Sequence, residues 1–330
     1  MPTSFDVSVV IPTYNRADLL PQTLASIVEQ SVPPAEIIIV DDGSTDGTEA
    51  LARRFRPPIR YTRIENSGVC RARNVGASLA TAPWIAYCDS DDLWHPDKLE
   101  SQVRLLRAVP GLEYAFTNFR VVTDGWSSTT KFDEVPAGYW DLPRREVRAD
   151  AFVVDAPLFE RVLTYNPIFP STVILSQHFF HRVGRWVEAL GRTLAEDLEF
   201  TLRCVTQPPI GVVSAPLVGI RKHPGGFSAD HLRTIKGEIE ILRYVVQQPY
   251  ARLHQAAVLD GIAKLNIAGA DVCFHSGDLA GVREFLNAVP REHRSWSLRA
   301  KSLVAGLPAR VAEPLREASL AVAARFRRQR

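Results

Sequence analysis

Three carboxylates lie within four positions of this sequence, in Asp89-Ser90-Asp91-Asp92, directly after the apolar run 84–88. Carboxylates this close repel one another strongly unless a cation neutralises them. Oxygen ligands of this kind suit Mg²⁺ or Mn²⁺, and such ions usually share their coordination with the phosphates of a substrate. The cluster therefore predicts a divalent-cation site. The alternative is that these residues complement the dipole of a helix beginning near His95-Pro96.

A second group of polar residues follows two earlier apolar runs. Asp41 and Asp42 come directly after the run 36–40, where a carboxylate can accept hydrogen bonds from the edge of a nucleotide base. Pro12 and Tyr14 follow the first apolar run, and the Tyr14 ring can stack on the same base. Each position also has a plainer explanation, turn formation for Asp42 and packing for Tyr14. Nucleotide-compatible groups after three separate strands together favour a nucleotide site.

The segments that carry these residues alternate between strand and helix signals. The expected elements are strands at 7–11, 36–40, 59–63 and 84–88, and helices at 18–29, 47–55 and 69–79. Strands that alternate with helices in this way predict an α/β fold with a mainly parallel sheet. Ligands bind such sheets at the carboxyl ends of the strands. We therefore expect the polar groups at one edge of one sheet.

The rest of the chain differs in character. Residues 123–168 contain Gly, Pro, Trp and Asp without a sustained period, which predicts a long insertion over the site. Helical patterns return at 195–205 and dominate after residue 230. We therefore expect a catalytic domain at 1–230 and a helical region with a basic tail at 231–330.

The composition excludes several classes of protein. The chain has 330 residues, of which 46% are hydrophobic and 23% charged, too apolar a composition for a disordered protein. Its longest apolar and nearly uncharged stretch, 210–220, is far shorter than the roughly 20 residues that span a bilayer. Four cysteines without paired spacing predict reduced thiols. The first residues show no secretory signal, so we expect a cytoplasmic location, and we expect no nucleic-acid partner.

The positive charge gathers towards the end of the chain. Residues 281–330 contain eleven Lys or Arg and four Asp or Glu. Leu315, Ala318, Val322 and Phe326 recur at helical spacing and would line one face of a helix. A basic amphipathic helix can lie on an anionic membrane surface, which predicts peripheral contact with the inner face of the membrane. The alternative is a helix packed on the protein with a solvated arginine tail.

Taken in order, the motifs resemble those of the family 2 glycosyltransferases, which have the GT-A fold. The matching segments are VSVVIPTYNR at 7–16, EIIIVDDGSTDGT at 36–48, NSGVCRARNVGASLA at 66–80, IAYCDSDDLWHPDKLE at 85–100, GRWVEALGRTLAEDLEFTLR at 184–203 and RKHPGGFS at 221–228. The resemblance covers about residues 5–230. It implies a Rossmann-like GT-A domain and an inverting, metal-dependent enzyme. Such an enzyme moves a sugar from a nucleotide-diphosphate donor, with a UDP-sugar favoured, to a saccharide or lipid-linked acceptor in polysaccharide or glycoconjugate synthesis.

The resemblance also implies roles for individual residues. Those expected to bind the nucleotide sugar are Pro12, Tyr14, Asp41, Asp42, Arg73, Asn74, Asp89 and Arg221. Those expected to ligate Mn²⁺ or Mg²⁺ are Asp91, Asp89 and His223. Asp197 is the expected general base, with Glu196 beside it, and Asp92 is expected to cap the next helix or to support the ligand shell of the metal.

The expected mechanism follows from the leaving group. A bound cation stabilises the charge on a departing nucleotide diphosphate, and a carboxylate takes the proton of the acceptor hydroxyl. Two alternatives stay open. A sugar-phosphate nucleotidyltransferase has the same needs but usually carries a Gly-rich basic loop where this chain has Pro-Thr-Tyr-Asn-Arg, and an inactive nucleotide-sugar-binding module would bind without transfer. A glycosidase also uses two carboxylates, but it does not explain base-binding groups at three strand ends.

Overall fold

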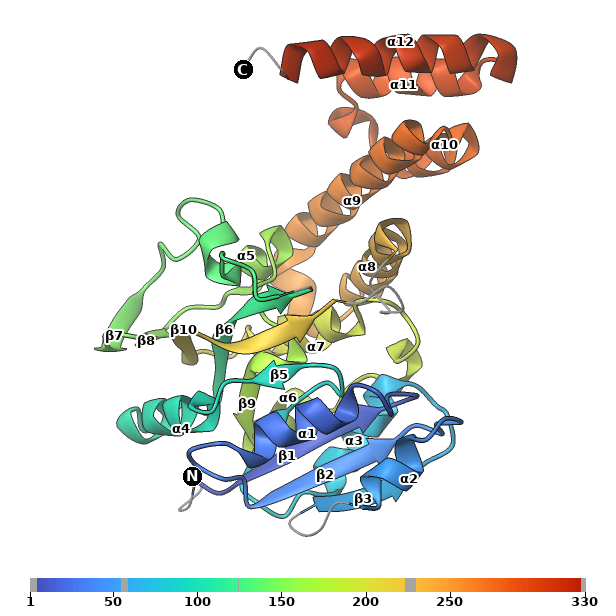
Figure 1. Cartoon of the computed structure of the whole chain (residues 1–330). Coiled ribbons are helices and arrows are strands. Elements are labelled where there is room, and N and C mark those ends of the chain that lie inside the picture. The colour runs from blue at the N-terminus through green and yellow to red at the C-terminus, as the bar shows by residue number, and fades with distance from the viewer. Residues whose placement is uncertain (1–4, 55–58, 124, 223–229, 328–330) are drawn as a thin grey trace. The chain divides into compact units, whose positions relative to one another are not determined.

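The computed structural model describes residues 5–54, 59–123, 125–222 and 230–327. The chain divides into two compact units, Met1–Ala229 and Asp230–Arg330 (Figure 1). All four cysteines are free, as their spacing predicts, and all four are buried.

The first unit is a mixed α/β domain. Its strands are β1 (Val7–Thr13), β2 (Glu36–Asp41), β3 (Ile59–Arg63), β4 (Trp84–Tyr87), β5 (Leu93–Trp94), β6 (Tyr114–Val122), β7 (Arg144–Arg148), β8 (Ala151–Val154), β9 (Val173–Ser176) and β10 (Ile210–Arg221). Its α-helices are α1 (Leu20–Val28), α2 (Thr48–Ala52), α3 (Val69–Leu79), α4 (Lys98–Ala108), α5 (Phe159–Thr164), α6 (Gln177–Val183) and α7 (Glu196–Cys204). Short 3₁₀ turns are η1 (Lys131–Glu134), η2 (Pro170–Thr172) and η3 (Glu188–Leu190).

The strands form one ten-stranded sheet in the order β3-β2-β1-β4-β9-β6-β10-β8-β7, with β5 paired to β10. The pairs among β1 to β4 and the pair β6–β10 are parallel, whereas β9, β8, β7 and β5 pair antiparallel. The predicted α/β fold is confirmed, and the sheet is mixed rather than mainly parallel. Antiparallel β9 lies between the two parallel parts, and no local pattern predicted that insertion.

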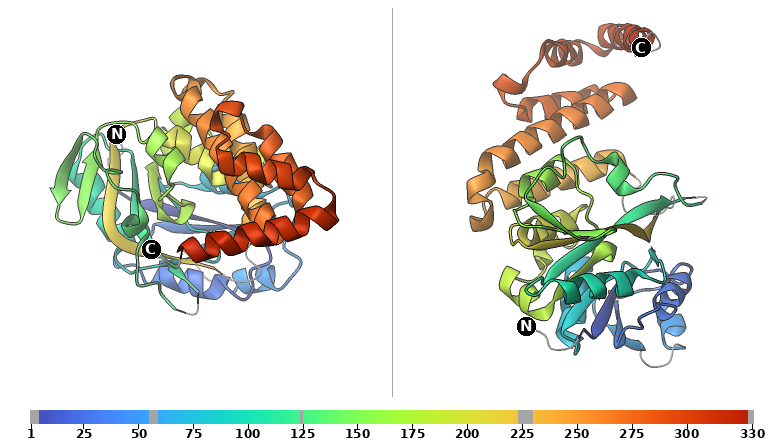
Figure 2. Two further views of the ribbon diagram at one scale, coloured as in Figure 1. Left: turned by 90° about the horizontal axis from the view of Figure 1, so that it is seen from above. Right: turned by 90° about the vertical axis from the view of Figure 1, so that its left-hand side faces the viewer.

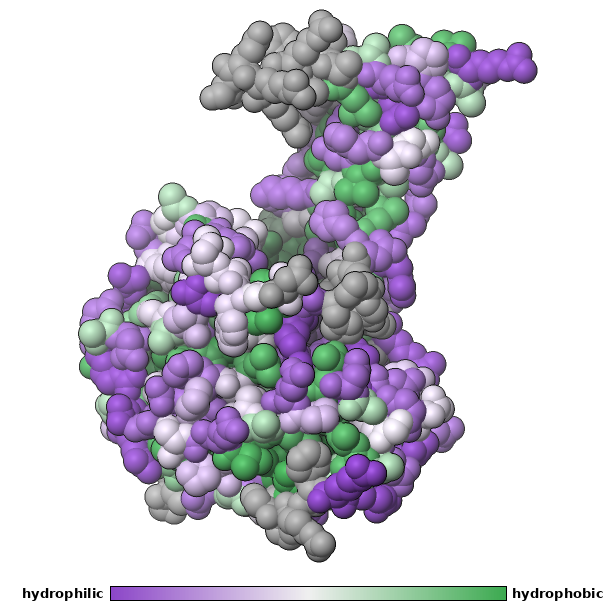
Figure 3. All heavy atoms as spheres, viewed as in Figure 1, coloured by the Kyte–Doolittle hydropathy of each residue, from purple (hydrophilic) through white to green (hydrophobic). Residues whose placement is uncertain are grey.

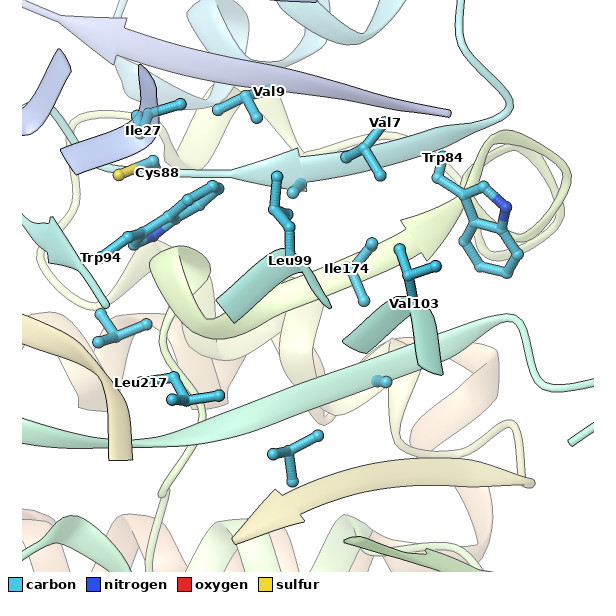
Figure 4. Close-up of a cluster of buried hydrophobic side chains, with 14 of the residues drawn as sticks. Val7, Val9, Ile27, Trp84, Cys88, Trp94, Leu99, Val103, Ile174 and Leu217 are labelled. Atoms are coloured by element: carbon cyan, nitrogen blue, oxygen red, sulfur yellow. The ribbon is translucent and has the colours of Figure 1, made fainter. Parts of the chain in front are cut away.

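Helices cover both faces of this sheet (Figures 1 and 2). On one face, α1 and α4 pack against the strands through Ile27, Leu99 and Val103, beside Val9 and Trp94 (Figure 4). On the other face, α3 lies so close to β1 that a Cβ at Gly76 would come within 2.2 Å of the Val10 side chain. Burial on both faces explains why β1, β2 and β4 are continuous apolar runs.

The segment 123–168 was expected to be an irregular insertion, and that expectation is wrong in part. β7 and β8 form an antiparallel pair within it, and β8 extends the sheet beside β10. β7 reads RREVR, and its first three residues are exposed. A charged edge strand of this kind avoids pairing with another chain, and it carries little of the hydrophobic signal by which strands are recognised.

The second unit is helical. It contains α8 (His231–Val245), α9 (Gln255–Ser276), α10 (Leu279–Ala288), α11 (Trp296–Gly306) and α12 (Ala309–Arg327), with 3₁₀ turns η4 (Pro249–His254) and η5 (Arg291–His293). Its core joins α8, α9 and α10 through residues such as Ile239, Phe274 and Phe285. Within the described ranges, no helix combines the length and the apolarity needed to cross a membrane.

Candidate active site

The polar groups predicted at strand ends lie at one edge of the sheet. Thr13 at the end of β1 is in register with Asp41 at the end of β2, and β4 runs parallel to β1 on the other side. Hydrogen bonds then join the loops, since Asn15 N donates to Ser44 Oγ at 2.9 Å. The chain reaches this arrangement because parallel strands end at a common edge.

Asp92 is the buried member of the acidic loop. It accepts hydrogen bonds from the Ser171 hydroxyl and from the backbone N–H of Arg221, and Ser171 Oγ also accepts from Asp89 N at 2.9 Å. Burial raises the pKa of Asp92, and the charges of Asp91 and Asp89 raise this pKa further. The expected helix cap is wrong, because α4 begins only at Lys98 and its N-cap is Asp97. Asp92 instead holds the acidic loop through these hydrogen bonds, and its expected support of the metal's ligand shell stays a prediction.

Asp89 and Asp91 are the more accessible carboxylates, with side chains 30% and 23% exposed. Each lies against an arginine. Asp89 Oδ1 accepts a hydrogen bond from Arg73 Nη2 at 2.9 Å, and Asp91 Oδ2 lies 3.4 Å from Arg16 Nε. The acidic charge of the loop is thus balanced by guanidinium groups.

We tested whether this loop suits a divalent cation. In the part of the chain that the structure describes, no group of three or more His, Cys, Asp or Glu side chains is placed to hold a metal. Asp89 and Asp91 offer two accessible carboxylates on one loop. This donor set fits Mg²⁺ or Mn²⁺, which commonly takes one or two carboxylates and completes its shell with water and phosphate oxygens. The third expected ligand, His223, lies outside the described residues.

Arg73 connects the acidic loop to the expected catalytic carboxylates. From α3, its buried guanidinium donates to Asp89 and, through Nη1, to Glu196 Oε1 at 2.7 Å. It also lies over the Trp186 ring, 4.5 Å from the centroid. Burial lowers the pKa of Arg73, but the charges of Asp89 and Glu196 outweigh that effect and raise the pKa. Arg73 therefore joins the acidic loop to Glu196, a residue 123 positions further along the chain than Arg73 itself.

Glu196 and Asp197 open helix α7. Ala195, directly before them, has φ 62° in the left-handed region, which costs a non-glycine residue about 1–2 kcal/mol. Burial raises the pKa of Asp197 to about 8, and the neighbouring charges of Glu196 and Asp89 add to the rise. A carboxylate with a pKa near neutrality is well matched to accepting a proton from a hydroxyl.

Asp41 and Asp42 both accept hydrogen bonds that stabilise the loops around them. Asp41 accepts from Ser44 N and from the Tyr61 hydroxyl, each at 2.7 Å. Asp42 accepts from the backbone N–H groups of residues 67 and 68, at 2.7 and 2.9 Å, where α3 begins. Loop formation thus accounts for both carboxylates, and their contact with a base stays a prediction.

Tyr14 and Pro12 differ in exposure. The Tyr14 side chain is 46% exposed at the strand edge, so packing does not explain it and its ring is available for stacking. Pro12 is buried within β1, in register with Val40. Its expected contact with the nucleotide stays a prediction.

The side chains of Asn74 and Arg221 both make hydrogen bonds to other residues of the chain. The Asn74 amide donates to the backbone oxygen of Trp186 and to Glu188, and it accepts from Trp186 N. The Arg221 guanidinium donates to the backbone oxygen of Asp91, and it also donates to α1 at Gln22, Thr23 and the carbonyl of Leu19. Packing explains Asn74, and Arg221 fastens the acidic loop to α1. Their expected contacts with the donor stay predictions.

Two residues of the site were not predicted from the sequence. Arg16 lies in the segment PTYNR after β1, where its charge was a usable signal. Ser171 lies in an irregular segment about 80 residues beyond the acidic loop that it supports, and nothing in its neighbourhood indicates that contact.

Comparisons with known proteins agree with this architecture. Residues 8–154 match the model of the family described as glycosyl transferase family 2. The chain is 30% identical, over an alignment of 338 residues, to the succinoglycan biosynthesis protein ExoO of Rhizobium meliloti, covering 98% of this chain and 86% of ExoO. It is 36% identical over 134 residues to the putative teichuronic acid biosynthesis glycosyltransferase TuaG of Bacillus subtilis, covering 39% of this chain and 53% of TuaG.

Other relatives are matched over part of their length. An uncharacterized glycosyltransferase of Haemophilus influenzae is 27% identical to the chain, and the match covers 63% of that relative. The chain thus spans about half the length of TuaG and somewhat less than two thirds of the length of this relative. Among solved structures, residues 1–349 of S. aureus TarS in complex with UDP-GlcNAc align with a TM-score of 0.62 at 19% identity, covering 95% of this chain and 92% of that one. At this identity the structural similarity supports the fold.

Proposed function

The chain belongs to the family 2 glycosyltransferases, and from that premise we propose that it transfers a sugar from a UDP-sugar to a saccharide or lipid-linked acceptor in polysaccharide synthesis. The names of ExoO and TuaG, which both refer to polysaccharide biosynthesis, support the acceptor class. The complexes of TarS with UDP and with UDP-GlcNAc support the donor class.

The observation that carries the proposal is the shared position of Arg73. It joins Asp89, in the loop proposed to meet the donor, to Glu196, the neighbour of the proposed base. The two halves of a transfer reaction, departure of a charged group and deprotonation of a hydroxyl, thus have their residues in one connected cluster.

The residues perform separate tasks in this mechanism. Asp197 accepts the proton of the acceptor hydroxyl, whose oxygen forms a bond to the anomeric carbon. The bond from that carbon to the diphosphate oxygen breaks, UDP leaves with the electron pair, and the single displacement inverts the carbon. Asp89 and Asp91 would hold Mn²⁺ or Mg²⁺, which when bound supplies positive charge beside the departing diphosphate. Tyr14 stacks on the base.

Donor binding tests the proposal directly. We expect a UDP-sugar with Mn²⁺ to raise the free energy of unfolding by roughly 2.7 kcal/mol at 100 times its Kd. Thermal unfolding with a panel of nucleotide sugars, with and without Mn²⁺, measures this effect, and UMP serves as the control ligand. No stabilisation by any nucleotide-diphosphate sugar would overturn the proposal.

Two further results would identify the alternative functions. Release of pyrophosphate from UTP and a sugar 1-phosphate would identify a nucleotidyltransferase, and donor binding without transfer would identify an inactive module.

We also propose that the second unit contacts the inner face of the membrane. Among its exposed apolar side chains, Trp296 and Leu303 on α11 are 84% and 73% exposed, and Leu315 on α12 is 46% exposed. Figure 3 shows hydrophobic residues at the surface of this unit among hydrophilic ones. Ala318 is exposed as the predicted stripe requires, whereas the side chains of Val322 and Phe326 lie outside those described.

Co-sedimentation with liposomes tests the membrane contact. We expect the chain to bind anionic vesicles at low salt and less at physiological salt, since each basic residue near the surface contributes about 1 kcal/mol and salt screens it. The double variant Trp296→Ser/Leu303→Ser and a chain truncated after Ala312 should bind less. Neutral vesicles are the control. Equal recovery of all proteins in the supernatant would exclude the contact.

A further inference from the structure

A hollow on the first unit lies apart from the residues assigned to donor and base. Its volume is about 440 Å³, which is in the range of small-molecule sites. Its lining comes from β6, β8 and β10 and from the chain between Thr130 and Glu146. None of the residues assigned to the donor, the cation or the base lines it.

One wall of this hollow is aromatic. Trp140 packs against Phe132 at 5.1 Å between ring centroids and against Phe152 at 5.3 Å, with interplanar angles of 56° and 82°. Phe152 is buried, while Trp140 and Phe132 are partly exposed. The edge contacts hold the indole in place, so it offers a rigid ring to a ligand.

Charged groups border the aromatic wall. The carboxylates of Asp133 and Glu146 are exposed there; Asp133 Oδ2 accepts from Thr130 and Glu146 Oε1 lies 3.5 Å from Arg144 Nε, and their second oxygens can accept hydrogen bonds from hydroxyl groups. The Arg144 guanidinium lies over the Phe152 ring, 5.0 Å from its centroid, and can donate. An apolar ring beside hydrogen-bond acceptors and donors matches a pyranose, which has CH groups on its faces and hydroxyls around its rim.

The floor of the hollow is held by buried Asn118. Its Nδ2 donates to Thr130 Oγ1 at 2.9 Å and to the carbonyl of Ser214 at 3.1 Å, and its Oδ1 accepts from the N–H groups of Phe119 and Phe132. These bonds fasten η1 to β6 and β10. The hollow is thus formed before any ligand arrives, which lowers the cost of binding.

The hollow is also distant from the acidic loop. Ser214 precedes Arg221 by seven residues on β10, a separation that would be roughly 20 Å in a regular strand and is shorter here because β10 shifts register between 213 and 218. Arg221 contacts both Asp91 and Asp92. None of the residues assigned to the donor or to the base lines the hollow, so a sugar bound there is a different one from the sugar that carries the reacting hydroxyl.

We propose that this hollow binds a saccharide unit of the acceptor chain, at a distance from the sugar that receives the transferred group. The acceptor is then an oligomer or polymer, and binding energy gained at the remote unit supports the reaction elsewhere. The role in transfer rests on the proposed function, but sugar binding can be measured without any transfer.

Saturation-transfer NMR on the full chain tests the site, with short glucans, galactans, chitin oligosaccharides and oligouronic acids as probes. We expect at least one probe to bind, and Trp140→Ala to weaken that binding about tenfold, as removal of an aromatic anchor typically does. Arg144→Gln and Glu146→Gln on exposed β7 should weaken it without affecting the fold. The matched control is Trp296→Ala, which removes an exposed indole from the second unit and should leave probe binding unchanged.

The outcomes separate this proposal from the proposed function. If no probe binds the wild-type chain, or if Trp140→Ala and the β7 variants bind as well as wild type, the saccharide site is wrong. Thermal unfolding with the UDP-sugar is run on the same variants, and we expect Trp140→Ala to retain donor stabilisation. Loss of donor stabilisation in the wild type, with sugar binding kept, would overturn the transferase mechanism and leave the saccharide site standing.

Discussion

Replacing Asp197 by asparagine should lower turnover by a factor of about 10²–10⁴ while donor Kd stays within a few-fold of wild type. The amide keeps the shape of the side chain and most of its hydrogen bonds, but it cannot accept the proton of the acceptor hydroxyl. Initial rates of product formation at saturating donor and acceptor measure the first effect, and donor titration followed by thermal unfolding measures the second.

Glu196→Gln is the matched comparison for this variant. Glu196 is held by Arg73 at 2.7 Å, so its carboxylate has a positioning task, and we expect a smaller loss of turnover. Normal turnover in Asp197→Asn would contradict the assignment and transfer the role of base to Glu196 or to another carboxylate.

The raised pKa of Asp197 also sets the expected pH dependence. Because only the ionised carboxylate accepts a proton, turnover should increase as pH rises through the pKa of Asp197, which is about 8 in the ligand-free protein and lower once a cation neutralises Asp89. Stability should change in the opposite direction. The folded chain binds the proton of Asp197 more tightly than the unfolded chain, so this group lowers the free energy of unfolding as pH rises from about 4 to about 8. Asp197→Asn should remove both dependences.

Asp91→Ala should abolish transfer and the Mn²⁺-dependent part of donor binding without harming the fold. The substitution removes one of three neighbouring negative charges, and the charge of Asp91 helps to raise the pKa of buried Asp92. We therefore expect the midpoint of thermal unfolding to stay the same or to rise. Turnover as a function of Mn²⁺ concentration, and donor titrations with and without Mn²⁺, measure the loss.

Asp97→Ala provides the control for Asp91→Ala. Asp97 lies a few residues further along, is 56% exposed, and makes no side-chain cap at the start of α4. It should transfer sugar at the wild-type rate. Near wild-type turnover of Asp91→Ala at saturating metal would show that Asp91 is not a metal ligand.

The part of the fold that surrounds the proposed donor site was readable from the sequence. The expected strands 36–40 and 84–88 differ from β2 and β4 by one residue each, and the expected helix 69–79 coincides with α3. These elements are buried and regular, so hydrophobic period and length alone identify them. The common edge of β1, β2 and β4 then follows from parallel pairing.

Contacts between segments that are distant in the sequence could not be predicted from it. The bond from Ser171 to Asp92 and the bonds of Asn74 to Trp186 join residues that are 79 and 112 positions apart. Such pairs leave no trace in local spacing. The same holds for antiparallel β9 between β4 and β6, because its pairing depends on the whole path of the chain.

Arg73, bonded to both Asp89 and Glu196, makes proton binding and ligand binding interdependent. The negative charge of Asp89 is among the causes of the raised pKa of Asp197. A ligand that neutralises Asp89 must therefore lower that pKa and release protons as it binds. Since such linkage is reciprocal, loss of the proton from Asp197 must tighten that ligand by the same factor. The affinity for a cation at the acidic loop is thus expected to increase as the solution becomes more alkaline, so that cation binding and deprotonation of the proposed base form a single coupled equilibrium.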